Sequence, residues 1–203
     1  MVVLVVAVMF IVFIAISYWG SRKVRQGANE TTAVPEPSSP ATPATYFHPA
    51  HTFARVLGDN VVEIGMDDFA KQAFGEVDAL DLPQIGRILK QGETAWKAHV
   101  GEKSVNQPMP VTGTVIAVNE GAGDSSWIIK VKPLSLQQSL ANLISEGMSG
   151  SWLNAVRAGF QNSYSGSLVP AMQDGGELVD GFAGNLQNGQ WEEFCKEFFN
   201  NVE

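Results

Sequence analysis

The sequence predicts three parts in order: an N-terminal transmembrane helix, a mainly-β domain of the small barrel or sandwich class, and a helical C-terminal extension. Residues 2–19 form an apolar run without a charge, proline or glycine, which is typical of a membrane span. Residues 45–134 contain short alternating segments separated by glycine turns, which indicate β-strands. From residue 135 onward the apolar positions follow the helical period of about 3.6.

Charge is distributed unevenly along the 203 residues. The chain carries 21 acidic and 13 basic side chains, and its net charge of −8 divides into +1 up to residue 44, −3 over residues 45–134 and −6 beyond. No cluster of Lys or Arg follows Arg25, so the chain lacks the basic surface that phosphate backbones require, and we expect no nucleic-acid partner. The single cysteine, Cys195, excludes an internal disulfide and a zinc site built from cysteines alone.

The apolar run at residues 2–19 is long enough to act as a membrane anchor. As a helix rising about 1.5 Å per residue, its 18 residues nearly cross a hydrocarbon layer of about 30 Å. A cleaved signal peptide would carry a basic start and a small-residue cleavage site, and neither is present. We therefore predict a single-pass anchor over residues 1–20, with the lipid bilayer as a partner.

The residues after the anchor set its orientation and lead into a linker. Arg22, Lys23 and Arg25 directly follow the apolar run, so the positive-inside rule places the following domains in the cytoplasm. Residues 21–44 then hold four prolines among Ser, Thr and Ala. About 20 residues in polyproline form, at roughly 3.1 Å each, reach up to about 60 Å from the bilayer.

Residues 45–134 show the strand pattern most clearly. Alternating residues 53–57 lead into a hairpin-type turn at residues 58–60, and the pattern resumes over residues 61–66. Asp67 is placed to cap a short helix that Gly75 ends, which explains the adjacent carboxylates of Asp67 and Asp68 without acid–base chemistry. Further strands are expected at residues 76–82, 87–90, 94–100, 111–118 and 127–131, with a turn at residues 101–102.

This central stretch resembles the H protein of the glycine cleavage system, a member of the lipoyl and biotinyl carrier-domain group. The matching segments are HTFARV at 51–56, VEIGMDDFA at 62–70, FGEV at 74–77, LPQIG at 82–86, QGE at 91–93 and PVTGTVIAVNE at 110–120. The resemblance implies a flattened β-barrel of two quasi-symmetric halves, a barrel-sandwich hybrid or single hybrid motif. It also implies a carrier lysine on a hairpin turn, with lipoate as the cofactor.

The match departs from the family at the carrier lysine. Family members carry the modified lysine in a Glu-Ser-Val-Lys-Ala run at a fixed distance before Pro-Val-x-Gly. Counting back from Gly113 without a gap, that position holds Glu102, and Lys103 comes one residue later. A shift of one residue turns a side chain to the other face of a strand, unless Gly101 allows the turn to be rebuilt. Lys103 is therefore the candidate attachment residue, displaced by one position from the family's lysine.

Two histidines are spaced so that both imidazoles could bind one metal ion. His48 and His51 lie three residues apart, but two imidazoles without a nearby cysteine or acidic cluster fall short of a zinc site. His51 also matches the first strand of the family. We expect no metal.

The C-terminal extension, residues 135–203, is predicted to be helical. Ser135 is placed as a cap for a first helix ending before Gly147, and Trp152, Val156 and Phe160 indicate a second. The last helix has a face made of Trp191, Phe194, Cys195, Phe198, Phe199 and Val202. This face either packs on the barrel or the other helices, or offers a groove to a partner protein.

Three functions follow from these features. The first is a membrane-anchored, non-catalytic H-protein-like adaptor or degenerate carrier. The second is a working lipoyl carrier on Lys103 that passes an acyl or aminomethyl group between cytoplasmic enzymes, the glycine decarboxylase complex among the candidates. The third is a scaffold whose helical tail recruits a membrane complex. Since no nucleophile elbow, zinc-protease pair, dinucleotide fingerprint or phosphate loop occurs in the sequence, we expect no enzyme activity.

Overall fold

The computed structural model describes residues 43–58, 60–121, 127–164, 172–173 and 177–199. The predicted transmembrane helix and nearly all of the predicted linker fall on residues 1–42 and lie outside the described residues. Within those described ranges, no helix has the length and apolar character to cross a bilayer. Ala41–Glu203 form one compact unit, without a division at the predicted boundary after Leu134.

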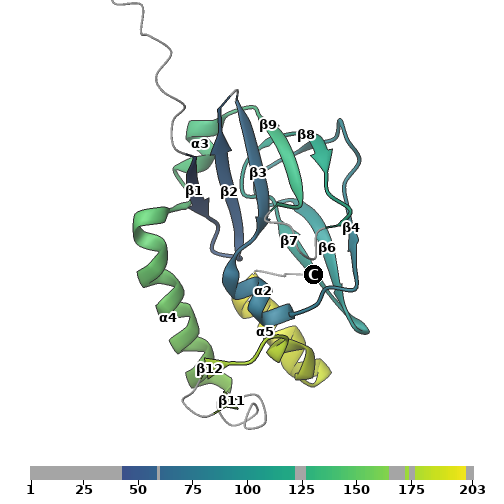
Figure 1. Cartoon of the computed structure of the whole chain (residues 1–203), viewed down its shortest axis with the longest axis vertical. Helices are drawn as coiled ribbons and strands as arrows, with labels where there is room; N and C mark the ends of the chain where they lie inside the picture. Colours follow the sequence, from purple (N-terminus) through teal and green to yellow (C-terminus); the bar gives the residue numbers. More distant parts are fainter. Residues whose placement is uncertain (1–42, 59, 122–126, 165–171, 174–176, 200–203) are drawn as a thin grey trace, which may run out of the picture. The chain divides into compact units, whose positions relative to one another are not determined.

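Seven antiparallel strands form the larger sheet (Figure 1). Their order across the sheet is β10 (Ile144–Ser145), β1 (Ala44–Phe47), β2 (Thr52–Leu57), β3 (Val61–Met66), β9 (Ile129–Pro133), β8 (Gly113–Val118) and β5 (Ile88–Leu89). The turn between β2 and β3 contains Asn60 at a positive φ of 57°, a conformation that Asn tolerates in turns. The predicted hairpin is confirmed at this position.

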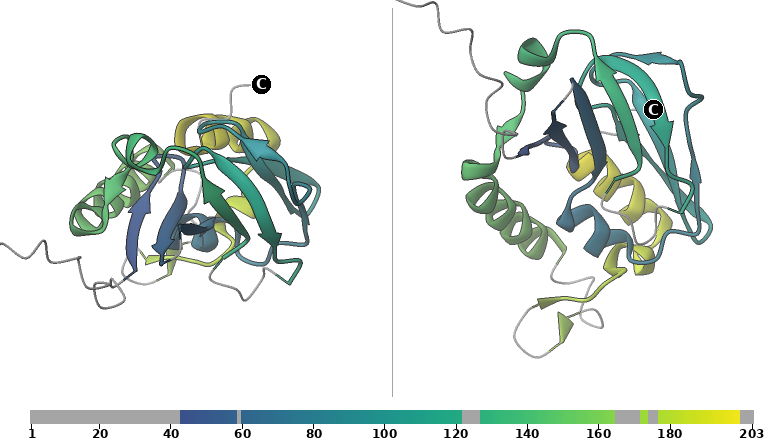
Figure 2. Two further views of the ribbon diagram at one scale, coloured as in Figure 1. Left: turned by 90° about the horizontal axis from the view of Figure 1, so that it is seen from above. Right: turned by 45° about the horizontal axis from the view of Figure 1, so that its top comes forward.

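A second, three-stranded sheet lies against the first (Figure 2). Its strands are β4 (Ala79–Asp81), β6 (Thr94–Val100) and β7 (Lys103–Pro108). Both sheets contribute to one buried core, in which Ile64, Val115 and Ile129 from the larger sheet join Trp96 and Val105 from the smaller one. The mainly-β fold is confirmed, and the described strands before residue 146 form two separate sheets, as in a sandwich.

The helical elements lie at both ends of the sandwich (Figure 1). They are α2 (Asp68–Phe74), α3 (Leu136–Leu140), α4 (Glu146–Tyr164), the 3-10 helix η1 (Phe182–Asn185) and α5 (Asn188–Phe199), with a short β11–β12 ribbon (Met172–Gln173 and Glu177–Leu178). Asp67 caps α2 by accepting the Ala70 N–H at 2.9 Å, as predicted. Ser135 is the N-cap residue of α3, as predicted, although its side chain makes no capping hydrogen bond. The predicted helix end at Gly147 is wrong, because α3 ends at Leu140 and Gly147 lies inside α4.

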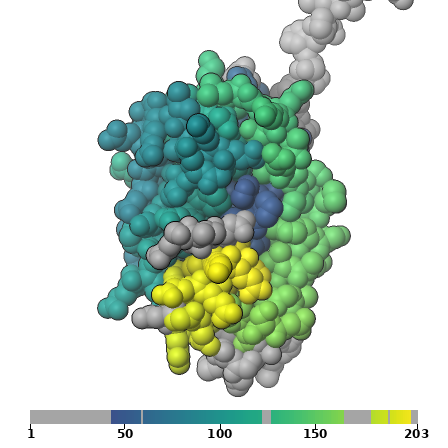
Figure 3. Space-filling model, turned by 180° about the vertical axis from the view of Figure 1, so that it is seen from behind, coloured from purple at the N-terminus to yellow at the C-terminus, as the bar shows by residue number. Residues whose placement is uncertain are grey.

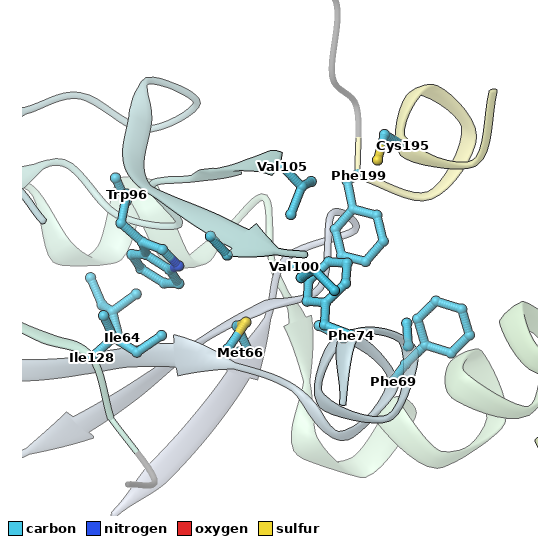
Figure 4. Packing of buried hydrophobic residues seen from close by; sticks show 14 of the residues in the cluster. Ile64, Met66, Phe69, Phe74, Trp96, Val100, Val105, Ile128, Cys195 and Phe199 are labelled. Carbon is cyan, nitrogen blue, oxygen red and sulfur yellow. The ribbon is translucent and has the colours of Figure 1, made fainter. Parts of the chain in front are cut away.

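The aromatic face of the last helix is buried in the chain's own core. Phe194 and Phe199 of α5 are 0% and 1% exposed, and Figure 4 shows Phe199 beside Phe74 of α2 and near Val100 of β6. Seen from behind, α5 (yellow) lies between the teal strands and green α4 (Figure 3). Of the two alternatives for this stripe, the structure shows internal packing for its buried rings, which contact other rings of the core. Phe198 is partly buried, and Val202 lies outside the described residues.

Candidate functional site

The β6–β7 hairpin carries the residues that matter for a carrier function. Its loop consists of two residues, Gly101 and Glu102, and Val100 pairs with Lys103 across the strands. Gly101 adopts a φ of +62°, which is strained for other residues. Its backbone N–H donates a hydrogen bond of 2.6 Å to the carboxylate of Asp78. The predicted turn is confirmed, and it is a tight one.

Strand alternation turns Lys103 away from the tip of this hairpin. Successive side chains of a strand point to opposite faces, so Lys103 shares a face with Val105 and Gln107, which are 1% and 0% exposed. Glu102 lies in the turn and is exposed, whereas Lys103 is half-buried. The hairpin therefore presents a carboxylate at its tip, and Lys103 points toward the C-terminal extension.

The C-terminal extension binds the Lys103 ammonium group through three contacts. Nζ donates to the carbonyl oxygen of Gly184 at 2.8 Å and also to that of Leu186. It further lies 5.3 Å from the ring centroid of Trp191, within cation–π distance. Carbonyl oxygens and an aromatic face are groups that stabilise a bound cation, so this arrangement holds the ammonium in place.

The segment that supplies these carbonyls is fixed by a close contact with α2. Gly181 at a φ of +75° donates its N–H to the carbonyl of Gln72 at 2.8 Å. A methyl group at Gly75 would lie only 2.8 Å from the Cα of Gly181, so the contact depends on the absence of a side chain there. Phe182 and Ala183 are fully buried beside it, which anchors η1 before the chain reaches Lys103.

The central part of the chain matches a family model and several curated proteins. Residues 45–155 match the model described as glycine cleavage H-protein, which is more than half of the chain. Glycine cleavage system H protein 2 of Pseudomonas syringae pv. tomato is 35% identical over 108 residues, which are 48% of this chain and 84% of that protein. A probable glycine cleavage system H protein of Pyrococcus abyssi is 32% identical over 109 residues, covering 49% and 81%.

The chain belongs to the glycine cleavage H-protein family. Among solved structures, a glycine cleavage system H protein from Mycobacterium marinum aligns with 55% of this chain and 96% of its own, at 17% identity and a TM-score of 0.47. The family match begins at the predicted domain start and continues past Leu134 into α4. Part of the predicted extension is thus within the family's own domain.

Within this H-protein-family domain, the hairpin does not fit a lipoyl group. Attachment needs an amine that projects freely from the tip of the turn. Glu102 at the tip has no amine, and the amine of Lys103 is bound by two carbonyl groups and a ring. The outer face of the hairpin carries His99, whose Nε2 lies 2.9 Å from the Asp81 carboxylate. Lys97 lies on the same face, but it pairs with Asn106, three positions back from the Val100–Lys103 pair, and so lies away from the tip.

His48 and His51, for which no metal site was predicted, contact other groups of the domain. His51 Nδ1 lies 2.8 Å from the Asp67 carboxylate, with both side chains almost fully buried. The His51 ring also stacks on Trp152 of α4 at 5.1 Å. His48 Nδ1 accepts the Ala50 N–H at 3.1 Å. Among the described residues, no group of three potential metal ligands occurs.

Sequence reasoning placed Lys103 at the hairpin but missed the groups that bind it. Gly184 and Leu186 contribute backbone carbonyls, which leave no trace in side-chain patterns, and they are 81 and 83 residues away. Trp191 was assigned to the aromatic face of the last helix. Its indole lies near the start of α5, next to the Lys103 ammonium. The Asp67–His51 pair was missed too, because capping of α2 already explained Asp67.

Proposed function

We propose that this protein is a membrane-tethered, non-catalytic adaptor of the H-protein family that carries no lipoyl group on its hairpin. The observation that carries the proposal is the Lys103 ammonium, bound by the Gly184 and Leu186 carbonyls and by the Trp191 ring. H proteins are lipoyl carriers and not catalysts, so a member without a free carrier amine keeps the protein-binding domain and loses the transfer step.

The tether is proposed from the sequence of residues 2–19. Their apolar character supports a single span, and Arg22, Lys23 and Arg25 support a cytoplasmic C-terminal domain. The prolines of residues 21–44 support an extended connection between the two. An adaptor held in this way binds its protein partners at the cytoplasmic face of the bilayer.

A working carrier on Lys103 is the second candidate. It is favoured by family membership and by the place of Lys103, which directly follows the two-residue loop. This function requires that the C-terminal extension releases the ammonium before an attaching enzyme can reach it. The lysine would then pass an aminomethyl or acyl group between cytoplasmic enzymes.

Intact mass separates the two candidates. The full chain is purified from a lipoate-replete host, alongside the variants Lys103→Ala and Glu102→Lys. We expect the unmodified mass for the wild type, because the Lys103 amine next to the hairpin turn is bound. We expect Glu102→Lys to gain about 188 Da, the mass of a lipoyl group, because the family's slot then holds an exposed amine.

The Glu102→Lys variant also serves as the positive control for the host. Its modification shows that the attaching enzyme of the host recognises this hairpin. If the wild type is then unmodified, the cause is the position of Lys103 and not a lack of lipoylation in the host. A wild type that is heavier by one lipoyl group, with the increment lost in Lys103→Ala, would overturn the adaptor and establish the carrier.

A further inference from the structure

One face of the larger sheet exposes an unusual number of aliphatic side chains. Ile88 of β5 pairs with Thr114 of β8, which pairs with Lys132 of β9, so these three residues lie side by side on the outer face. The exposed aliphatic residues of this region are Ile85 (65%), Ile88 (58%), Ile116 (41%) and Leu134 (60%). We call this surface the β5–β8–β9 face.

The strand pairing places the four aliphatic residues close to one another on this face. Leu134 follows Lys132 by two positions, and its N–H donates to the Thr112 carbonyl, which continues the β8–β9 pairing. Ile116 occupies the irregularity in the same pairing, between Val115 and Ala117. Ile85 lies in the turn whose Gly86 N–H donates to the Val115 carbonyl. Leu89, which follows Ile88 on β5, is buried and points to the opposite side, into the core.

Basic side chains accompany these apolar ones in an otherwise acidic chain. Arg87, Lys90 and Lys132 are all exposed and lie within two residues of Ile85, Ile88 or Leu134. Lys130, also on β9, is bound to Glu63 at 3.0 Å. The nearby Glu93 carboxylate accepts the backbone N–H of Lys90 at 2.9 Å. The whole chain has a net charge of −8, so three exposed cations here contrast with the rest of the molecule.

We propose that the β5–β8–β9 face docks on the surface of an anionic phospholipid bilayer. Exposed aliphatic side chains enter the boundary between headgroups and acyl chains, and neighbouring Lys and Arg bind the anionic headgroups. The proposal deepens the proposed function and rests on its membrane tether. A linker that reaches about 60 Å gives the domain freedom to turn this face to the membrane.

The composition of the face favours a bilayer over a protein partner. Centres of protein interfaces are enriched in aromatic residues that fill pockets on the partner, whereas the exposed apolar residues here are three isoleucines and a leucine. All exposed charged side chains within two residues of these four are basic, which suits a continuous anionic surface. The cytoplasmic leaflet, which the proposed orientation would place next to this domain, carries such anionic lipids.

The test measures how fast a cysteine on this face reacts when the full chain is reconstituted in vesicles. Ile88→Cys reports on the face, and Met148→Cys, which replaces an α4 residue of 67% exposure, is the matched control. A membrane-impermeant maleimide is added to neutral phosphatidylcholine vesicles and to vesicles with about 30% phosphatidylserine. We expect anionic lipid to slow Ile88→Cys about fivefold or more and to leave Met148→Cys unchanged.

Charge variants complete the test, together with a flotation measurement that shows whether the chain stays attached to the vesicles. Adding Lys90→Glu with Lys132→Glu should restore the fast rate of Ile88→Cys on anionic vesicles, whereas Lys196→Glu on α5 should not. Ile85→Cys serves as the reporter if Ile88→Cys does not fold. Equal rates on both vesicle types, in a chain that floats with both, overturn the docking and leave the tether standing. A chain that floats with neither overturns the tether and the docking together.

Discussion

At the scale of single residues, Gln107 is the most anomalous side chain of the core. It is 0% exposed, and neither its Nε2 nor its Oε1 has a hydrogen-bond partner among the described residues. It pairs across the strands with Trp96, whose indole N–H is also unpartnered there. Buried polar atoms of this kind destabilise a fold because their hydration is lost without replacement.

Replacing Gln107 by methionine is therefore expected to stabilise the protein. The side chains have similar length and flexibility, so the gain comes from removing two buried polar groups. We expect the free energy of unfolding in urea to rise by about 1 kcal/mol. Gln84→Met at an exposed position is the control. A loss of stability in Gln107→Met would show that the amide is satisfied by groups that the described contacts do not include.

The thiol of Cys195 is expected to be inert in the folded protein. Burial raises its pKa to about 12, against a smaller lowering by the nearby Lys103 ammonium. Because the thiolate is the reactive form, a neutral-pH thiol reagent should react with the chain only after unfolding. The measurement compares the rate with 5,5′-dithiobis(2-nitrobenzoate) before and after addition of guanidinium. Rapid reaction of the native chain would contradict the packed position of α5.

His48 gives the fold a dependence on pH. Burial, and to a lesser extent the nearby His51, lower the pKa of His48 below its ordinary 6.5. The unfolded chain therefore binds a proton at the His48 imidazole more readily than the folded chain does. The stability that His48 contributes is therefore present above pH 6.5 and is lost as the pH falls from 6.5 toward the lowered pKa.

The variant His48→Asn isolates this effect. Asparagine supplies an acceptor for the Ala50 N–H, which His48 Nδ1 accepts at 3.1 Å, but does not titrate. We expect the free energy of unfolding to fall less steeply in the variant than in the wild type between about pH 7 and pH 5. Parallel curves for the two proteins would show that His48 is protonated equally well in the folded and unfolded states.

At the scale of elements, local patterns predict some strands well and others not at all. The bounds of β3 and β6 agree with the predicted ranges 61–66 and 94–100, because apolar residues alternate there and turns limit both strands. Strand β7 was not predicted. Its sequence KSVNQP contains only one clearly apolar residue, Val105, and its inward positions include Lys103 and Gln107. A strand that directs polar groups inward has no alternation to detect.

The contact of Lys103 with the C-terminal extension joins strand β7 to η1 and α5. Removing the ammonium in Lys103→Met leaves the carbonyls of Gly184 and Leu186 without their donor. We expect a loss of about 1–3 kcal/mol in the free energy of unfolding and faster amide hydrogen exchange in η1 and α5. Lys196→Met, on the exposed side of α5, is the control. Unchanged exchange in Lys103→Met would mean that aromatic packing alone holds the extension.

The candidate site was predictable in position and unpredictable in its contacts. Counting residues from Gly113 identified Glu102 and Lys103, and the two-residue turn put these residues at the hairpin end. The direction of the Lys103 side chain followed from strand alternation once β7 was known. Its partners come from backbone groups more than 80 residues later, and no local pattern encodes a contact between a lysine and a distant carbonyl.

At the scale of the whole molecule, the C-terminal extension is part of the core and not an appendage. The sequence divided the chain after Leu134, yet the buried cluster joins strand residues such as Val105 to Phe160 of α4 and Phe194 of α5. Phe69 of α2 lies 6.3 Å from Phe160 and 5.7 Å from Phe198, measured between ring centroids. The β domain therefore depends on residues beyond its predicted end for the burial of α2.

Ending the chain after Leu134 tests this dependence. The truncation uncovers Phe69 and Phe74, which are 0% and 2% exposed in the whole chain. Phe69 loses one aromatic neighbour on α4 and one on α5, and Phe74 loses two on α5. Since losing one large core side chain already costs about 3–5 kcal/mol, we expect the truncated chain to aggregate or bind a hydrophobic dye. Phe194→Ala in the full chain should lower the unfolding midpoint without abolishing folding. A truncated chain that unfolds cooperatively at the wild-type midpoint would instead make the β domain independent, and the Lys103 contact would then be a removable cover over an otherwise complete hairpin.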